Sequence, residues 1–194
     1  MEKIIKPQRS RRLNATDWEC AALHALAEHG LGGLAIESLA RQLGVTKGSF
    51  YWHFSSRDAL LDATLERWER DVERTLLAEI APQVDPRARL RELFRRIARE
   101  VQPHQVYASL LRALDHPRVQ PMMARVSQRR MDFLALAFRQ AGLHREAATH
   151  RARLTYAAYI GFLQTNVHLG LPRLSHEDYD AYVEHVIDTL IPRS

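Results

Sequence analysis

Residues 36–54 read IESLARQLGVTKGSFYWHF, and this stretch decides the fold. Its apolar spacing predicts two short helices joined by a tight turn. Gly44 stands where the first helix has to end, because a residue without a Cβ adopts positive φ without a clash. Thr46 follows at a position where its hydroxyl can cap the next helix. This arrangement is typical of a helix-turn-helix, whose second helix lies in the major groove of DNA.

The same stretch supplies a small core. Phe50 and Phe54 are assigned to this core, and Ala40 is small where the two helices would cross closely. The other side chains that can face it are Leu39, Leu43, Val45 and His53. One recognition helix reads only a few base pairs, so useful specificity requires two of them, spaced about one turn of DNA or a small multiple of it. The motif therefore predicts a homodimer and a palindromic site on double-stranded DNA.

The composition sets the class of protein. With 194 residues the chain can form one sizeable core or two small ones that share an interface. No apolar run approaches the roughly 20 residues that span a bilayer, and the N-terminus lacks the apolar core of a signal peptide. A single cysteine, Cys20, excludes an internal disulfide framework, which favours a reducing cytoplasm. We expect Cys20 to be an inert thiol in the core.

Positive charge is concentrated at the N-terminus. The net charge is +5, and five basic residues stand among the first dozen against one acid, Glu2. These basic residues are Lys3, Lys6, Arg9, Arg11 and Arg12. Two interpretations stay open: a solvated, disordered tail, or an arm that neutralises phosphates beside the docked helix.

The rest of the chain predicts an all-α protein of about nine helices. Before the motif, Thr16-Asp-Trp-Glu19 matches a capping box, and the helix it starts ends at His29-Gly30, with Gly32-Gly33 as a loose link. Helices are then expected from Ser55 or Ser56 to about Ala81, from Leu90 to near Pro103, from Val106 to Leu114, from Val119 to Ala141, from His144 to about His168, and from Ser175 to Ile191. Pro82 and Pro86 are expected to bracket a linker. We divide the chain into a DNA-binding domain at 1–60 and a larger helical bundle at 61–194.

The N-terminal pattern resembles the tetracycline-repressor (TetR) family of bacterial transcription regulators. The resemblance is carried by Leu39-Ala40, by LGVTKGSFYWHF at residues 43–54, and by RDALL at residues 57–61. It implies an N-terminal three-helix DNA-binding domain, a C-terminal ligand-binding and dimerisation bundle, and a repressor that a ligand releases from its operator. Members often carry Thr where Leu34 and Ala35 stand here, so a helix cap at that place is not expected.

The candidate DNA contacts lie on and around the second helix of the motif. They are Thr46, Lys47, Gly48, Ser49, Tyr51, Trp52, His53 and Arg57, together with Arg9, Arg11 and Arg12 of the arm. Ser49 and Trp52 are expected to face the groove, with packing on a neighbouring helix as the alternative for Trp52. Lys47, which has no obvious acidic neighbour in the sequence, should reach a phosphate or a base edge.

The other contacts have structural alternatives. Thr46 can cap its helix, contact a phosphate, or do both. Gly48 lowers helix propensity by about 1 kcal/mol relative to Ala, which suggests a close approach to DNA. By the resemblance, Tyr51 donates its hydroxyl to a phosphate. His53 either contacts a phosphate or packs beneath the helix. Arg57 should clamp a phosphate, with an ion pair to Asp58 or Asp62 as the alternative.

The C-terminal half supplies the other two predicted sites. The helix at residues 155–170 is apolar on several faces, so it is buried either in the core of the domain or against a partner chain. The resemblance favours the partner and implies a dimer interface at Tyr156, Ala157, Tyr159, Ile160, Gly161, Phe162, Tyr182, Val186 and Leu190. The resemblance implies an effector pocket, with candidate lining residues Trp68, Phe94, Tyr107, Met122, Met123, Phe133, Phe138 and Asn166. These suggest an apolar or aromatic effector and no cofactor. Residues 56–81 form the expected lever between pocket and DNA.

Three other hypotheses remain beside this one. The first is a DNA-binding regulator with the same fold that is released from DNA by a protein or a redox signal instead of a small-molecule effector. A metal-binding protein or an enzyme would have to use the ten histidines, but the chain contains no HExxH, GxSxG or glycine-rich phosphate loop, so we expect no catalytic activity and no metal. The basic arm could also favour a membrane surface, although it lacks interleaved aromatic residues.

Overall fold

The computed structural model describes residues 13–78, 85–99, 101–171 and 175–191, and it confirms an all-α fold over these ranges, which contain no strand. The nine α-helices of the described ranges are α1 (Ala15–His29), α2 (Ile36–Gln42), α3 (Lys47–Phe50), α4 (Arg57–Ala78), α5 (Pro86–Arg99), α6 (Val101–Leu111), α7 (Val119–Gln140), α8 (Arg145–Phe162) and α9 (His176–Leu190). A short 3-10 turn, η1 (Gly30–Gly33), follows α1, and a π-helical turn, η2 (Leu163–His168), ends α8.

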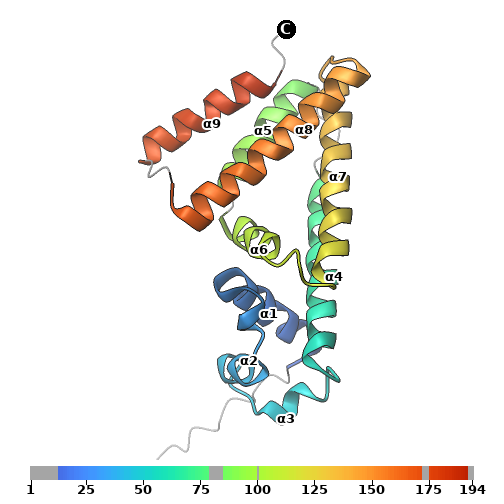
Figure 1. Cartoon of the computed structure of the whole chain (residues 1–194), viewed down its shortest axis with the longest axis vertical. Helices are drawn as coiled ribbons and strands as arrows, with labels where there is room; N and C mark the ends of the chain where they lie inside the picture. The colour runs from blue at the N-terminus through green and yellow to red at the C-terminus, as the bar shows by residue number, and fades with distance from the viewer. Residues whose placement is uncertain (1–12, 79–84, 100, 172–174, 192–194) are drawn as a thin grey trace, which may run out of the picture.

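The molecule is elongated, with two groups of helices at opposite ends. Figure 1 shows α1, α2 and α3 at one end and α5, α8 and α9 at the other, with α4 and α7 running side by side between them. The short helix α6 lies between the two groups and packs on α1 and on η2. Both α4 and α6 therefore connect the N-terminal helices with the C-terminal bundle.

The N-terminal helices are held by one aromatic core. Trp18 and Phe50 are fully buried and meet edge to face, with ring centroids 5.3 Å apart. The three-to-four spacing of apolar residues in α1 predicts one buried stripe, and this is confirmed, since Trp18, Ala21, Ala22, Ala25 and Leu26 are all buried. Leu39, Ala40 and Phe54 are buried with them, while Leu43 and Val45 are partly buried and pack against the same cluster. This cluster continues along α4 into α6 and α7.

A second buried cluster joins the C-terminal helices. Leu90 of α5, Phe138 of α7, Ala148 of α8 and Ile187 of α9 lie within it. No helix in the described part of the chain is both long and apolar enough to cross a membrane. The predicted domain boundary near residue 60 falls inside α4, whose Leu60 and Leu61 belong to the N-terminal core. The division into two domains stays a prediction.

Several predicted helix ends were wrong. The capping box of α1 uses Asn14 and Asp17, and not Thr16 and Glu19, because the Asn14 side chain accepts from the Asp17 amide and the Asp17 carboxylate accepts in return. Pro86 begins α5 instead of closing a linker, since the first turn of a helix does not need its N–H. For the same reason Pro103 is tolerated in the first turn of α6, which begins at Val101 and ends at Leu111.

Other differences concern α8 and the first helix. The α-helical part of α8 ends at Phe162, and residues 163–168 continue as the π turn η2. Cys20 is exposed on α1, so its assignment to the core was wrong. The end predicted for α4 at Ala81 lies outside the described residues, as do Pro82 and the basic arm from Lys3 to Arg12.

Two glycines fix the path of the chain near the motif. Gly44 has φ of +68°, which confirms that the turn needs a residue without a Cβ penalty. Gly33 was predicted to lie in a loose link, and this was wrong. A Cβ at Gly33 would lie 2.6 Å from the Ala25 carbonyl oxygen and 3.1 Å from the His29 Cβ. The link between α1 and α2 is therefore packed directly on α1.

Gly33→Ala should destabilise the N-terminal helices by about 1–3 kcal/mol, because the added methyl forces the turn away from α1. Gly32→Ala is the matched control, since a Cβ there meets no atom within 4 Å. Thermal or urea unfolding of the two variants measures the difference. Equal stabilities would contradict the packing of Gly33 on α1.

Candidate nucleic-acid interface and internal pocket

The short helix α3 and the residues after it carry a set of exposed side chains, and one buried side chain, Phe50, anchors them to the core. Phe50 is fully buried, whereas Tyr51 is 55% and Trp52 is 87% exposed. Thr46, Lys47 and Gly48 are also exposed, and Ser49 and His53 are half-buried. We call the exposed set Thr46, Lys47, Gly48, Tyr51 and Trp52 the α3 surface. Because Trp52 points into solvent, its alternative assignment to packing on a neighbouring helix was wrong.

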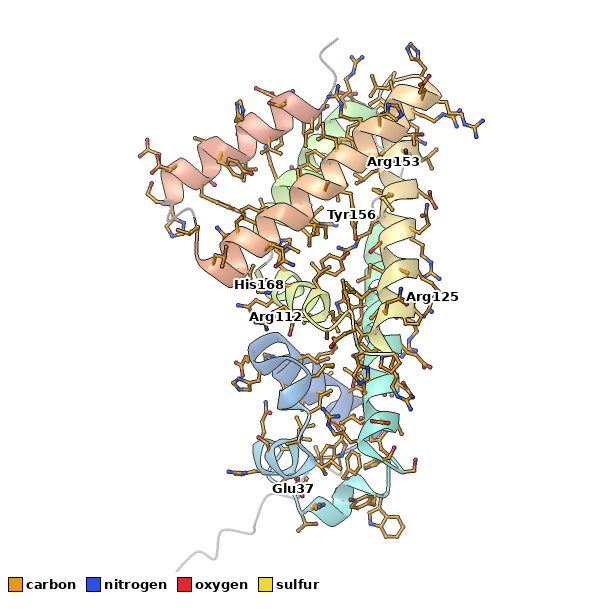
Figure 2. The ribbon with its side chains drawn as sticks, in the orientation of Figure 1. Glu37, Arg112, Arg125, Arg153, Tyr156 and His168 are labelled. Carbon is orange, nitrogen blue, oxygen red and sulfur yellow. The ribbon has the colours of Figure 1, made fainter. Side chains whose placement is uncertain are left out.

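Lys47 has an acidic partner that the sequence analysis missed. Its Nζ lies 2.5 Å from Oε1 of Glu37 on α2 (Figure 2 labels Glu37). The hydrogen bond to Lys47 lowers the pKa of Glu37, and the same bond raises the pKa of Lys47. Both groups stay charged near neutral pH, and both side chains are more than half exposed. The pair therefore holds Lys47 in place without adding much stability.

Thr46 and Gly48 lie at the start of α3 with few internal contacts. Thr46 occupies the N-cap position, but its side chain makes no capping hydrogen bond, so its predicted capping role was wrong. Likewise Ala35 caps α2 without a side-chain hydrogen bond, as expected at that place. A Cβ at Gly48 would meet only the Thr46 Oγ1, at 3.7 Å. The fold therefore leaves room for a side chain at residue 48, and packing within the chain does not account for this glycine.

Arg57 has a contact that the sequence did not predict. Its Nε donates to the Leu34 carbonyl at 3.1 Å, and one terminal nitrogen donates to the Leu31 carbonyl at 2.5 Å. The alternative ion pair with Asp58 or Asp62 was wrong, because both of these carboxylates contact Arg118. Arg57 thus fastens the start of α4 to the turn before α2. A phosphate contact by Arg57 stays a prediction and would need the remaining terminal nitrogen.

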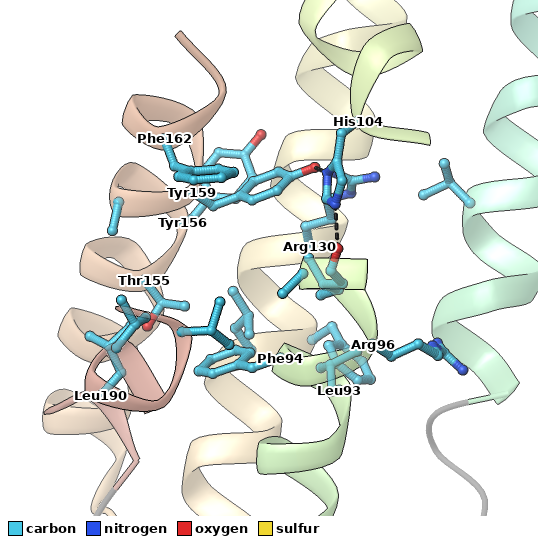
Figure 3. A pocket seen from close by; sticks show the side chains of 18 of the residues that line it. Leu93, Phe94, Arg96, His104, Arg130, Thr155, Tyr156, Tyr159, Phe162 and Leu190 are labelled. Carbon is cyan, nitrogen blue, oxygen red and sulfur yellow. Dashed lines mark hydrogen bonds between the residues drawn. The ribbon is translucent and has the colours of Figure 1, made fainter. Parts of the chain in front are cut away.

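The C-terminal bundle encloses a cavity of about 470 Å³. Figure 3 shows Tyr156, Tyr159 and Phe162 with His104 at one end and Leu93, Phe94 and Leu190 at the other. Of the predicted lining residues, Trp68, Phe94 and Phe133 do line it.

The other predicted lining residues lie elsewhere. Tyr107 stands behind the wall, where its ring stacks on Trp68 and Tyr159 at centroid distances of 5.7 and 5.9 Å. Met122, Met123 and Phe138 are buried in the two cores, and Asn166 is half-buried outside the lining. Met122, Met123, Phe138 and Asn166 were therefore wrong as pocket residues, because their helix faces point into the cores or away from the cavity.

The hydroxyl groups around the pocket are bonded to one another. The Tyr156 hydroxyl lies 2.6 Å from the Ser127 Oγ and also contacts the Tyr107 hydroxyl. His104 Nδ1 lies 2.9 Å from the Tyr159 hydroxyl. Burial raises the pKa of Tyr156 and of Tyr159, and the nearby charge of Arg130 opposes the rise in both. Both tyrosines are therefore neutral phenols at physiological pH.

Most of the predicted dimer residues point into the bundle. Tyr156, Tyr159, Phe162, Val186 and Leu190 line the pocket, and Ile160 packs against the N-terminal cluster, so these six are corrected to interior positions. Ala157 and Gly161 are exposed, as an interface would require, and Tyr182 is partly exposed but also lines the pocket. Leu154, which the sequence analysis left out, is 57% exposed one turn before Ala157. In the described part of the chain, no group of three or more His, Cys, Asp or Glu side chains could hold a metal.

Comparison with known proteins finds a family that is similar to the N-terminal helices. Residues 21–64 match the family described as "Bacterial regulatory proteins, tetR family". The tetracycline repressor protein class A of transposon 1721 from Escherichia coli is 50% identical over 46 residues, which are 24% of this chain and 21% of that protein. The HTH-type transcriptional regulator BetI of Burkholderia cenocepacia is 35% identical over 72 residues, 37% of each chain. The chain thus matches well under half the length of these relatives.

Solved structures extend the likeness to the whole fold. A putative transcriptional regulator from Saccharomonospora viridis, in complex with choline, superposes with a TM-score of 0.76 at 19% identity, over 91% of this chain and 94% of that one. A transcriptional regulator from Rhodococcus sp. Rha1 superposes with a TM-score of 0.74 at 22% identity, over 92% of this chain and 94% of that one. The helix-turn-helix and the larger C-terminal helical region are both present in these neighbours.

Proposed function

We propose that this chain, whose N-terminal domain belongs to the tetR family of bacterial regulatory proteins, is a sequence-specific DNA-binding repressor in the bacterial cytoplasm. The observation that carries the proposal is the α3 surface, which lies within the matched residues. There Tyr51 and Trp52 are exposed, while the preceding residue, Phe50, is buried and anchors the helix. The proposal also holds that a small molecule bound in the internal pocket releases the protein from its operator.

The α3 surface has the chemistry of a groove contact. Lys47 and the Tyr51 hydroxyl can reach phosphates and set the position of the helix, whereas Trp52 and Ser49 are placed to meet base edges. Gly48 leaves the backbone of α3 open to a close approach, since packing inside the chain does not explain it. The N-terminal arm, with Arg9, Arg11 and Arg12, would add phosphate contacts beside the helix.

The proposal requires two copies of the chain. One α3 surface reads a few base pairs, so specificity needs a second one at a fixed spacing on a palindrome. The exposed stripe of Leu154, Ala157 and Gly161 on α8 and the exposed Tyr182 on α9 support a homodimer through these two helices. Small residues in such a stripe allow close approach of two copies of α8.

The helix α4 supports the proposed ligand response. Trp68 lines the pocket, and Arg57, eleven residues earlier on the same helix, binds the carbonyls of the turn before α2. A ligand that shifts α4 would thus change the spacing of the two α3 surfaces. The choline bound by the Saccharomonospora viridis neighbour is consistent with a small-molecule site in this fold. The pocket favours this hypothesis over a regulator without an effector, and the comparisons lend no support to an enzyme.

Selection of bound fragments from random or genomic DNA with the purified protein tests the proposal. A recovered motif with two-fold symmetry and half-sites about one helical turn apart, or a small multiple of it, would support it. Binding that depends steeply on salt but recovers no motif would contradict sequence-specific regulation.

Lys47→Ala and Tyr51→Phe should weaken binding to every DNA sequence, because they remove contacts to phosphate. For Lys47→Ala the slope of log affinity against log salt should fall by about 1. Trp52→Ala and Ser49→Ala should change which bases are preferred. Gel-shift titrations against the selected site and its single-base variants measure both effects. No loss for Lys47→Ala and Tyr51→Phe together would refute the assignment.

Glu37→Gln should strengthen DNA binding, because it releases Lys47 from its carboxylate and removes a negative charge beside the phosphates. The salt slope should steepen by up to about 1. Glu66→Gln is the matched control, since Glu66 is also an exposed partner of a cation, Arg70, but lies on α4 away from α3. Fluorescence anisotropy at several salt concentrations compares the two, and equal effects would argue against competition between Glu37 and DNA for Lys47.

Ala157→Glu should convert the protein to a monomer, because a two-fold interface would bring two carboxylates together. Affinity for the palindromic site should fall at least about tenfold. Ala124→Glu places the same change at an exposed alanine of α7 as a control. Sedimentation velocity measures the oligomeric state, and an unchanged dimer would move the interface away from Ala157.

A further inference from the structure

We propose that the internal pocket takes an apolar ligand carrying a carboxylate, such as an aromatic or alkyl carboxylate, and that the Arg130 guanidinium binds that carboxylate. The inference rests on the proposed function, in which this pocket receives the effector. It adds the chemical class of that effector and names the residue that recognises its charge.

Arg130 differs from the other arginines on its helix. Arg125 and Arg129 lie on another face of α7, where both pair with Glu69 at 2.8 and 3.2 Å. Arg130 instead lines the pocket, and among the described residues no carboxylate lies within 4.0 Å of its guanidinium. A half-buried arginine that faces a cavity without a carboxylate partner is suited to bind an anion there.

The aromatic residues at this end of the pocket are already engaged by a cation. The Arg130 guanidinium carbon lies 4.3 Å from the Tyr107 ring centroid and 5.8 Å from the Tyr159 ring centroid. A cationic ligand seeking these ring faces would find them occupied by Arg130 and would meet a like charge. The positive charge of Arg130 therefore disfavours a cationic ligand at this end of the pocket.

The remaining charges around the pocket point to the same ligand class. The charged lining residues are Arg96, Arg130 and Asp71. The Asp71 carboxylate already contacts two arginines of its own helix, Arg67 and Arg74. Arg130 therefore brings to the pocket a positive charge that has no carboxylate partner among the described residues, which favours a negatively charged ligand group.

Two other polar groups of the lining are bonded to neighbouring atoms of the chain, whereas the buried Thr155 hydroxyl has no hydrogen-bond partner. Tyr156 is bonded to Ser127 and Tyr107, and the His104 ring contacts the Tyr159 hydroxyl and the Ile97 carbonyl. Arg130 also interacts with the Tyr159 hydroxyl, but a guanidinium has five N–H donors, so most of its capacity remains. Arg130 can thus offer a ligand a charged donor with several free N–H groups.

The rest of the pocket wall favours an apolar body for the ligand. Leu93, Phe94, Phe133, Leu134 and Leu190 supply apolar surface away from Arg130. A cavity of about 470 Å³ lies in the range that holds small organic molecules. A ligand with one acidic group, which would meet Arg130, and an apolar or aromatic body, which would meet this wall, therefore fits the pocket.

Two sets of matched probes test the proposal. Decanoate, decanol and decylamine form one set, and 4-phenylbutyrate, 4-phenylbutanol and 4-phenylbutylamine form the other. Binding to the full chain is measured by calorimetry and by the fluorescence of Trp68 against a Trp68→Phe control. At least one carboxylate should bind at least about tenfold tighter than its alcohol and its amine. Equal binding within both sets, or no binding of either carboxylate, would overturn the proposal.

Arg130→Met removes the charge while keeping an unbranched apolar stem of similar length. The Arg130→Met variant should bind the carboxylate probe only as tightly as it binds the matched alcohol, and its affinity for the alcohol should be unchanged. Arg130→Lys should keep part of the preference, and Arg139→Met, at an exposed arginine of the same helix, should leave it unchanged. Retained alcohol binding shows that the pocket is still folded in the Arg130→Met variant. An unchanged carboxylate preference in that variant would overturn the role of Arg130.

DNA binding of the ligand-free protein, measured in parallel, separates this proposal from the proposed function. A carboxylate preference that depends on Arg130 supports the ligand class even if no operator is found. In that case the regulatory function fails and the ligand assignment stands. Conversely, specific DNA binding together with tighter binding of the amine would keep the regulator and refute the acidic ligand.

Discussion

The burial of Phe50 is the contact on which the exposed surface of the N-terminal region depends. The helix α3 has only four residues, and a helix of that length has no independent stability in water. Its orientation is set by the edge-to-face contact of Phe50 with Trp18 and by the nearby ring of Phe54 at 5.6 Å. Because Phe50 faces inward, Tyr51 and Trp52 have to face outward. A single buried aromatic ring thus determines which side chains can meet DNA.

The same core reaches the pocket without a break. Leu60, Leu61 and Leu65 of α4 belong to the cluster that surrounds Phe50, and Trp68, one turn further along, belongs both to this cluster and to the pocket lining. Packed interiors shift as discrete units instead of deforming gradually. In the proposed response, a displacement of Trp68 by a ligand would therefore be transmitted along α4 to Arg57, whose two carbonyl contacts hold the turn before α2.

The sequence predicted what depends on local periodicity, and it could not predict what depends on how helices cross. The stripe of α1 and the positive φ of Gly44 follow from spacing and backbone sterics, and both were confirmed. The pair of Lys47 with Glu37 requires the crossing of α2 and α3, which no pattern in either helix encodes. On α8 nearly every face carries apolar residues, so spacing alone could not separate Tyr156, which lines the pocket, from the exposed Ala157.

Arg130 shows how a pocket can hold a cation before its ligand arrives. A guanidinium taken partly out of water needs compensation, and the faces of Tyr107 and Tyr159 supply it at about 0.5–2 kcal/mol. An incoming carboxylate adds a charge-assisted hydrogen bond of about 1.5–3 kcal/mol, and the rings need not be displaced to make it. The ring contacts therefore stabilise the empty pocket and orient the guanidinium. If the rings keep these contacts when the ligand binds, only the new bond and the burial of the apolar body would contribute to the free energy of the proposed shift between DNA-binding and released forms.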